Sequence, residues 1–188
     1  MVFYIQYVLN LFISELYRIL KNNSINFFSL LSMETAYIKT PLETATITGD
    51  ENGISVISVA DEGELSDIIL VVLQQAAKQL SDYFESKRTD FDFALNPKGT
   101  EFQQKVWKAL LEIPFGKTCS YMDLSKKLGD VKAIRAVASA NGKNPLWIVV
   151  PCHRVIGTDG SLTGYAGGLW RKKWLLEHEN PTLQQRLF

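Results

Sequence analysis

Short segments in which apolar and polar residues alternate fill the chain between residues 35 and 61. β-Branched residues are common in these segments, and turn-forming residues such as Pro41 and Asn52-Gly53 separate one segment from the next. This pattern predicts an antiparallel meander of short strands. The three expected strands are TAYIKT (35–40), TATITGD (44–50) and GISVISVAD (53–61).

Apolar residues at helical spacing follow the expected strands. We expect this helix to be capped by Ser66 or Asp67 and to run to about Phe84, with one apolar stripe covering a face of the sheet. The next segment, TDFDFALNPKG (89–99), is typical of a linker, because it contains an Asn-Pro pair and a glycine. The expected stripe contains Ile68, Val71, Val72, Gln75, Leu80 and Phe84.

Helical spacing returns after the linker. Thr100 and Gln103 match the two halves of a capping box, which predicts a helix that begins here and continues to Ile113. Pro114 and Gly116 follow and would end it. The expected inner stripe is Phe102, Val106, Leu110 and Ile113.

Two further short helices are expected in the second half of the chain. The first runs from Ser120-Tyr121 to Leu128, and the second runs from Val131 to about Ala140 after a turn at Gly129-Asp130. Two short helices joined by a turn that contains glycine form a helix-turn-helix pattern. The second helix is rich in alanine, so it could lie close to a DNA groove, or the alanines could serve only close packing between helices.

Residues 1–32 have a separate pattern of apolar residues at helical spacing, interrupted by polar and charged residues. The uncharged run is shorter than the ~18 residues of a membrane span, and no basic n-region or cleavage site indicates a signal peptide. The segment could be an amphipathic helix on the protein body, a weak membrane-surface helix, or sequence translated from a start codon upstream of the natural one. We favour the last, with Met33 as the first residue, because the regular pattern begins just after Met33.

The composition indicates a folded protein without metal or disulfide support. With 188 residues, of which 46% are hydrophobic and 21% charged, the chain fits one large domain or two small ones, and it resembles neither a disordered chain, a collagen nor a coiled coil. Two cysteines and two histidines are too few for a disulfide framework or a four-ligand zinc site. Few cysteines also suit a reducing compartment, where a thiol stays free for chemistry.

The overall charge of zero hides a difference between the two halves of the chain. Residues 33–99 carry 5 Lys/Arg and 12 Asp/Glu, whereas residues 100–179 carry 12 Lys/Arg and 7 Asp/Glu. Attraction to a polyanion depends on local positive charge, so the second half could bind nucleic acid. The same distribution is also compatible with an ordinary surface of ion pairs.

The residues with the most reactive side chains follow the apolar run Trp147-Ile148-Val149-Val150, which predicts a short buried strand ended by Pro151. Cys152, His153 and Arg154 come next. A nucleophilic cysteine needs a base or a nearby positive charge, and both are present. Neighbouring side chains rarely face one another, so we expect His153 to reach Cys152 through a turn or a water, with Glu179 as the orienting carboxylate. The alternative is a buried, unreactive thiol beside a hydrogen-bonded histidine.

The stretches NPLWIVVPCHRVIG (144–157) and GSLTGYAGGLWRKKWLLEHE (160–179) resemble the methylated-DNA–protein-cysteine S-methyltransferase family, in its bacterial, non-regulatory form. The PCHRV core carries most of this resemblance, which covers residues 33 to about 180. It implies an α+β fold, with a small antiparallel-sheet domain of ribonuclease H-like type at 33–98 and a mostly helical, winged helix-turn-helix-like domain at 99–180. Residues 1–32 and the tail 181–188 would lie outside these domains.

The resemblance implies that the protein repairs O6-alkylguanine and O4-methylthymine in double-stranded DNA by a single irreversible transfer with base flipping. Cys152 would accept the alkyl group, His153 would take the thiol proton through a water, and Glu179 would orient His153. Asn144 would brace the turn near the cysteine. No cofactor, metal or obligate protein partner is implied, and the protein would be a monomer in the cytoplasm.

The resemblance also implies which residues contact DNA. Arg135 would enter the base stack, and Tyr121 would rotate the target phosphate. The guanine pocket would be formed by Val155 through its backbone, Tyr165 through its hydroxyl, and a loop wall at Gly167 and Gly168.

Two positions differ from familiar members of the family. Ala166 replaces a serine found in some relatives, and Trp147 is bulkier than usual, so the tolerance for large alkyl groups could differ. Three other functions remain as alternatives to a repair transferase. They are a lesion-sensing protein that binds without transfer, a helix-turn-helix transcription factor, and a hydrolase that uses cysteine and histidine.

Overall fold

The structure of the protein is a computed structural model that describes residues 32–61 and 63–181. The expectations for residues 1–31 and for the tail lie outside these ranges, apart from Pro181. All the elements below belong to the unit that begins at Glu34. We call residues 34–84 the sheet region and residues 101–179 the helical region. Together they form an α+β fold, as expected.

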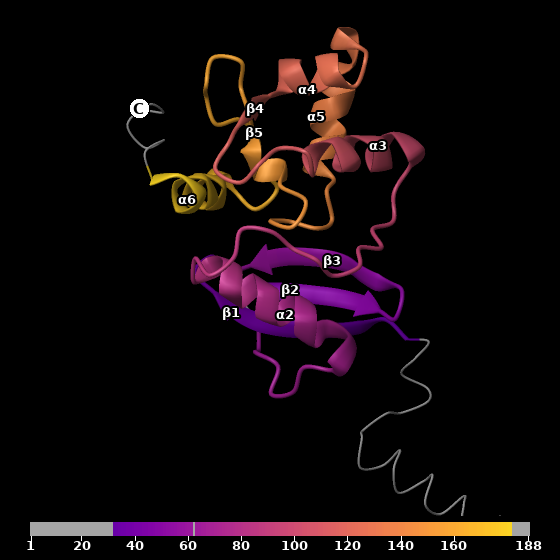
Figure 1. Cartoon of the computed structure of the whole chain (residues 1–188), viewed down its shortest axis with the longest axis vertical. Helices are drawn as coiled ribbons and strands as arrows, with labels where there is room; N and C mark the ends of the chain where they lie inside the picture. Colours follow the sequence, from indigo (N-terminus) through magenta and orange to yellow (C-terminus); the bar gives the residue numbers. More distant parts are fainter. Residues whose placement is uncertain (1–31, 62, 182–188) are drawn as a thin grey trace, which may run out of the picture. The chain divides into compact units, whose positions relative to one another are not determined.

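Three antiparallel strands form the sheet region in the order β1-β2-β3, and they confirm the expected meander (Figure 1). The strands are β1 (Glu34–Thr40), β2 (Glu43–Asp50) and β3 (Gly53–Ala60). Alternate apolar side chains point into the core, where Ile47 and Ile57 are completely buried. Gly53 occupies the β2–β3 turn with φ of 128°, and a Cβ there would lie 2.6 Å from the Ala94 carbonyl oxygen. Only glycine fits this turn.

Helix α2 (Val71–Phe84) packs across the sheet (Figure 1), but it begins later than the expected Ser66 or Asp67. Ser66 instead pairs with strand β1, because its amide donates to the Tyr37 carbonyl and its Oγ accepts from the Tyr37 amide, both at 3.0 Å. The expected apolar stripe is therefore only partly correct. Ile68 and Val71 are 78% and 75% exposed. The buried side chains of α2 are Leu73, Ala76, Ala77, Gln79, Leu80 and Tyr83.

The free edge of β3 contacts two segments from outside the meander. The Ile54 amide donates to the Ala94 carbonyl at 2.9 Å, so the expected linker runs beside the strand. Further along, the Ile57 amide donates to the Pro145 carbonyl at 2.8 Å and its carbonyl accepts from the Trp147 amide at 2.9 Å. Both bridges are parallel, and they cover an edge that would otherwise have unpaired backbone groups.

Helix α3 (Glu101–Leu110) begins with the expected capping box, because Thr100 Oγ1 accepts from the Gln103 amide and Gln103 Oε1 accepts from the Thr100 amide. The helix ends at Leu110 rather than at Ile113, which lies in a following turn. Phe102 of the expected stripe is 40% exposed, whereas the other three members of that stripe are buried.

The helix-turn-helix pattern is present in the helical region. Helix α4 (Tyr121–Lys127) is capped by Ser120, whose Oγ accepts from the Asp123 amide at 3.0 Å. The second expected helix begins with a 3₁₀ turn, η2 (Val131–Ala133), and continues as α5 (Ile134–Gly142). Asp130 caps the 3₁₀ turn by accepting from the Lys132 amide. The two helices pack against each other (Figure 1).

The buried strand expected at 147–150 is wrong. Leu146 makes the bridge to β3, and the chain then folds into tight turns in which the Val150 amide donates to the Leu146 carbonyl at 2.9 Å. Ile148 has φ of 72°, a conformation that β-branched residues rarely adopt. The apolar run is continuous because the turn is buried, not because it belongs to a sheet.

The remaining elements follow this turn. Residues Cys152–Arg154 form a 3₁₀ turn, η3, and β5 (Val155–Ile156) pairs in parallel with β4 (Cys119–Ser120). Helix α6 (Leu169–Glu179) closes the helical region. Among the described residues, no helix is both long enough and apolar enough to cross a membrane.

Candidate active site

Cys152 lies at the first position of η3, and only 3% of its surface is exposed. Burial raises the pKa of its thiol to about 11, although a hydrogen bond from Asn144 and the positive charge of Lys172 partly oppose this effect. The thiol is therefore neutral at rest. A nucleophilic role requires a base that removes its proton when the substrate is in place.

Asn144 holds the strained turn that precedes the cysteine. Its Nδ2 donates to the Val150 carbonyl at 2.7 Å and to the Leu146 carbonyl at 3.3 Å, while its Oδ1 accepts from the Leu146 amide at 3.0 Å. The side chain thus replaces the backbone pairing that a strand would have provided. The resemblance implied a bracing position for Asn144, and its part in the chemistry stays a prediction.

His153 and Glu179 face each other inside the protein, with both side chains completely buried. The distance from His153 Nε2 to Glu179 Oε1 is 2.8 Å, which places the ring proton on Nε2. Nδ1 is then an unprotonated, buried nitrogen that has no hydrogen-bond partner among the described residues. Burial lowers the pKa of His153, although Glu179 opposes this shift, so the ring is neutral at pH 7. A neutral imidazole with a free lone pair can act as a base.

Glu179 is fixed by several donors besides the histidine. Arg154 donates through Nε to Oε2 at 2.8 Å and through Nη2 to Oε1 at 2.9 Å, and the Gly116 amide donates to Oε2 at 3.1 Å. Burial alone would raise the pKa of this carboxyl, but the hydrogen bonds and charges of His153 and Arg154 outweigh burial and hold the pKa well below its usual range. Glu179 is therefore ionised at neutral pH, and its role as an orienting carboxylate stays a prediction.

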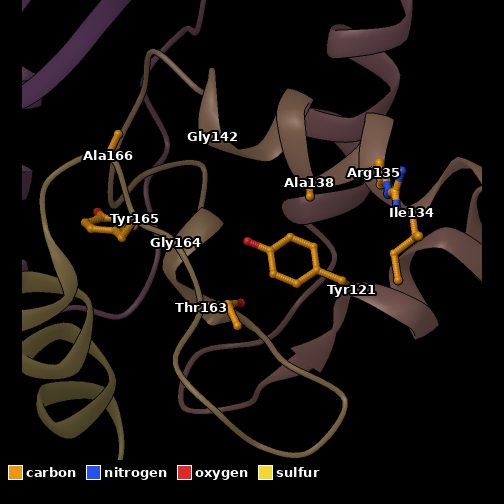
Figure 2. A pocket seen from close by; sticks show the side chains of 9 residues that line it. All are labelled: Tyr121, Ile134, Arg135, Ala138, Gly142, Thr163, Gly164, Tyr165 and Ala166. Atoms are coloured by element: carbon orange, nitrogen blue, oxygen red, sulfur yellow. The ribbon is translucent and has the colours of Figure 1, made fainter.

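A cavity of about 580 Å³ lies between α5 and the loop before α6 (Figure 2). Tyr121 stands between these two walls and points its hydroxyl toward the loop, where Tyr165 lies. The Tyr121 hydroxyl accepts from Asn141 Nδ2 at 3.2 Å, and the same nitrogen donates to the Cys152 carbonyl at 3.4 Å. The cavity is thus linked to the cysteine. Its lining is Tyr121, Ile134, Arg135, Ala138, Gly142, Thr163, Gly164, Tyr165 and Ala166.

Arg135 is exposed at the cavity and belongs to the second helix of the helix-turn-helix. The neighbouring lining residues Ala138 and Gly142 lie on the same helix and have little or no side chain. Small residues keep this wall open, so that a flat ring could lie against it. Ala166, which faces the cavity from the loop, brings no hydroxyl.

Three other residues that the sequence predicted for the pocket are not among the lining residues. Val155 is completely buried, and its carbonyl accepts from Lys172 Nζ at 2.6 Å. A Cβ on Gly167 would lie 2.6 Å from the Trp147 ring, so this glycine makes room for the bulky indole. Gly168 precedes α6 with φ of 85°. Their contacts with guanine remain predictions.

Four buried residues near the site were missed at the level of sequence. Asn141 joins Tyr121 to Cys152 through hydrogen bonds to both residues. Lys172 holds the loop before α6, which we call the cavity loop, by donating to the Thr163 carbonyl at 2.7 Å. Arg171 and Tyr83 connect the helical region with the sheet region. Arg171 donates to the Leu42 carbonyl, and the Tyr83 hydroxyl donates to Glu179. A polar residue within a mostly apolar helical face was the signal for Asn141 and Tyr83, whereas the buried face of α6 contains three charged residues and gave no such signal for Arg171 or Lys172.

The described residues contain no group of three or more His, Cys, Asp or Glu side chains placed to hold a metal ion.

Comparisons with known proteins give matches over both regions of the chain. Residues 101–181 match the family described as 6-O-methylguanine DNA methyltransferase, DNA binding domain, and residues 33–97 match its ribonuclease-like domain. The methylated-DNA–protein-cysteine methyltransferase of Methanosarcina barkeri is 41% identical over 153 residues, which cover 78% of this chain and 97% of that protein. The corresponding Mycobacterium tuberculosis protein is 56% identical over 104 residues, covering 55% of this chain and 63% of that protein.

Solved structures give the same result. The crystal structure of the Mycobacterium tuberculosis O6-methylguanine methyltransferase has a TM-score of 0.72 and 40% identity, covering 80% of this chain and 94% of that one. The structure of the Mycobacterium tuberculosis protein OGT in complex with DNA has a TM-score of 0.72 and 42% identity, covering 78% of this chain and 92% of that one.

Proposed function

Because the chain belongs to the 6-O-methylguanine DNA methyltransferase family, we propose that it repairs alkylated DNA by transferring the alkyl group to its own Cys152. The Cys152 sulfur attacks the alkyl carbon of O6-alkylguanine in line with the C–O6 bond. A carbon–sulfur bond forms as the carbon–oxygen bond breaks, and the electron pair of the broken bond stays on the guanine, which takes up a proton. The thioether is not hydrolysed, so each molecule acts once.

The buried pair of His153 and Glu179, which we call the relay, supplies the base that this reaction needs. The thiol proton moves to Nδ1 of His153, directly or through a water, and the resulting imidazolium is stabilised by Glu179 at 2.8 Å. Arg154 keeps the carboxylate ionised and oriented. Because the thiol pKa is about 11, the thiolate forms only when the relay and the substrate are both in place.

The position of the thiol requires base flipping. The O6 position of guanine lies inside a duplex and Cys152 lies inside the protein, so the nucleotide must leave the stack, which costs a few kcal/mol. The cavity has a suitable size for one base, and Tyr121 and Tyr165 provide aromatic walls. Arg135 stands at the cavity on an alanine-rich helix and fills the gap that the flipped nucleotide leaves.

The partner is double-stranded DNA that contains O6-alkylguanine, and O4-methylthymine is a second substrate. Val155, Gly167 and Gly168 contribute to the recognition of guanine through the backbone and the loop. The protein acts as a monomer in the cytoplasm, where reducing conditions keep Cys152 as a thiol.

The observation that carries the proposal is a buried cysteine beside a neutral, carboxylate-oriented histidine and a base-sized cavity. The test is incubation with an oligonucleotide that contains O6-methylguanine, followed by peptide mass spectrometry. We expect one methyl group per protein molecule on Cys152. Cys152→Ala should abolish transfer but retain DNA binding, whereas the matched Cys119→Ala variant should transfer normally.

The same assay distinguishes the alternative functions. Multiple turnovers would indicate a hydrolase. Binding to damaged DNA without transfer would indicate a lesion sensor, and binding that ignores the lesion would indicate a transcription factor. A wild-type protein with an unmodified Cys152 after exposure to the lesion would refute the proposal.

A further inference from the structure

Tyr83 lies at the C-terminal end of α2, in the sheet region, yet its hydroxyl contacts the relay of the helical region. The hydroxyl donates to Glu179 Oε1 at 2.9 Å, and Tyr83 is completely buried. The same carboxylate oxygen faces His153 Nε2 at 2.8 Å. The two groups therefore share one acceptor atom with Arg154 Nη2, although Tyr83 and Glu179 lie 96 positions apart in the sequence.

The surroundings of Tyr83 hold its ring in a single place. Its backbone carbonyl lies 2.8 Å from His178 Nε2, and its ring meets the His178 ring edge to face at 5.1 Å. Phe115 and Phe91 pack against the same ring at centroid distances of 6.2 and 5.6 Å. These contacts would also hold a phenylalanine, so the ring alone fills the core. The hydroxyl is needed only for the hydrogen bond to Glu179.

The role of this hydrogen bond follows from the chemistry of the shared oxygen. Burial and the adjacent Glu179 raise the pKa of the Tyr83 phenol well above its usual value, so the hydroxyl stays protonated and can donate to Oε1. A donor on Oε1 draws negative charge away from the lone pair that faces His153. The other charged groups that act on this pair are Arg154 from η3 and Lys172 from α6, and neither belongs to the sheet region.

We propose that Tyr83 is a positioning residue for alkyl transfer, through which the sheet region fixes Oε1 of Glu179 and limits how strongly this oxygen attracts the proton of His153. The inference rests on the proposed function, because it assigns Tyr83 to the relay of that reaction. It also explains why the repair chemistry is attached to a second structural region: the relay lacks one of its hydrogen-bond donors without α2.

The test is the pH dependence of the single-turnover transfer rate for wild type, Tyr83→Phe and the control Tyr37→Phe, which removes a hydroxyl from the exposed side of β1. In Tyr83→Phe, more charge remains on Oε1, so the imidazolium is favoured and the pKa of His153 rises. A protonated His153 cannot accept the thiol proton. We therefore expect the acid limb to move to higher pH by roughly half a unit to one unit. Tyr37→Phe should match wild type.

A stronger donor should act in the opposite direction. Site-specific 3-fluorotyrosine at position 83 keeps the ring and the hydroxyl but makes the hydroxyl more acidic, so the acid limb should move to lower pH. This variant also keeps the test valid if Tyr83→Phe folds poorly. An acid limb that stays in place in both variants would overturn the inference, even if the plateau rate falls, because a purely structural role changes the amount of active protein and not the pH profile.

A second measurement separates this inference from the proposed function. The chain contains only two histidines, so ¹⁵N-histidine labelling gives a simple spectrum in which His153 can be titrated without DNA. We expect the His153 titration in Tyr83→Phe to shift toward higher pH. If wild type transfers no alkyl group, the proposed function fails while this titration still tests the contact. If wild type transfers normally and neither variant changes His153, only the assignment of Tyr83 fails.

Discussion

Replacing Glu179 with glutamine changes one oxygen into an NH₂ group at the point where the relay and the fold meet. The carboxylate accepts five hydrogen bonds, from Tyr83, His153, two Arg154 nitrogens and the Gly116 amide. A glutamine can accept only through its single oxygen. If its NH₂ group takes the place of Oε2, this donor group faces the N–H groups of Arg154 and Gly116. Neither of these N–H groups then has an acceptor at that position.

The expected cost follows from burial. Arg154 is 7% exposed, so its guanidinium would lose its counter-charge without reaching water. Removing one partner of a buried ion pair costs about 3–5 kcal/mol, against a total unfolding free energy of about 5–15 kcal/mol for an ordinary domain. With a urea m-value of about 2 kcal/mol per molar, the unfolding midpoint of Glu179→Gln should fall by about 1.5–2.5 M.

Urea unfolding followed by tryptophan fluorescence measures this change, and Glu112→Gln is the control. Glu112 pairs with Lys127 at 2.7 Å, but both side chains are about half exposed, so its loss should cost at most about 1 kcal/mol. The effect of Glu179→Gln should also depend on pH. Because the folded pKa of Glu179 is depressed, its stabilisation is present above the unfolded pKa of about 4.3 and is lost as the pH falls below that value.

The difference between wild type and Glu179→Gln should therefore shrink between about pH 5 and pH 3. A midpoint change no larger than that of the control would refute the reasoning, because it would mean that Arg154 finds other partners or solvent. A large change that stays constant over this pH range would show that the loss comes from packing and not from the charge of Glu179.

Three other substitutions test separate parts of the molecule. Arg135→Ala should slow transfer from duplex DNA about tenfold or more in rapid-quench assays but hardly affect transfer from a single-stranded substrate. Equal losses on both substrates would show that Arg135 has no role in base flipping. Thr100→Ala should lower the unfolding free energy by about 1 kcal/mol through loss of the capping box, and Thr100→Ser should restore most of it in thermal melts. Arg171→Met should lower the unfolding free energy by about 2–3 kcal/mol, because the guanidinium donates to the Leu42 and Gly167 carbonyls. It should also increase proteolysis of the cavity loop, and an unchanged cleavage pattern would contradict this.

The parts of the fold that sequence patterns predicted are those fixed by neighbouring residues. The meander follows from alternation over a few residues and from turns that require Gly53. The capping box of α3 depends on residues only three positions apart. By contrast, the start of α2 depends on Ser66 pairing with Tyr37, 29 positions away, and this contact outweighs the capping preference of serine.

The turn at 147–150 shows a different limit of sequence reasoning. A continuous apolar run indicates burial, but burial does not distinguish a strand from a turn whose polar groups are satisfied by a side chain. Asn144 provides those hydrogen bonds, and Ile148 adopts a conformation that no propensity would assign to it. The motif around Cys152 indicated the chemistry, whereas the donors that arrive from α2 and α6 could be found only in three dimensions.

The burial of Cys152 has a consequence for a protein that is used once. An exposed thiolate would react with any electrophile or oxidant, and each such reaction would consume one repair molecule. Cys152 is 3% exposed with a thiol pKa of about 11, so it is a poor nucleophile toward molecules in solution. In the proposed mechanism, its reactivity depends on His153 and on an alkyl carbon delivered through the cavity. Burial thus lowers the intrinsic reactivity of the thiol and makes its reaction selective. The relay on which this reaction would depend is held by donors from both regions of the fold.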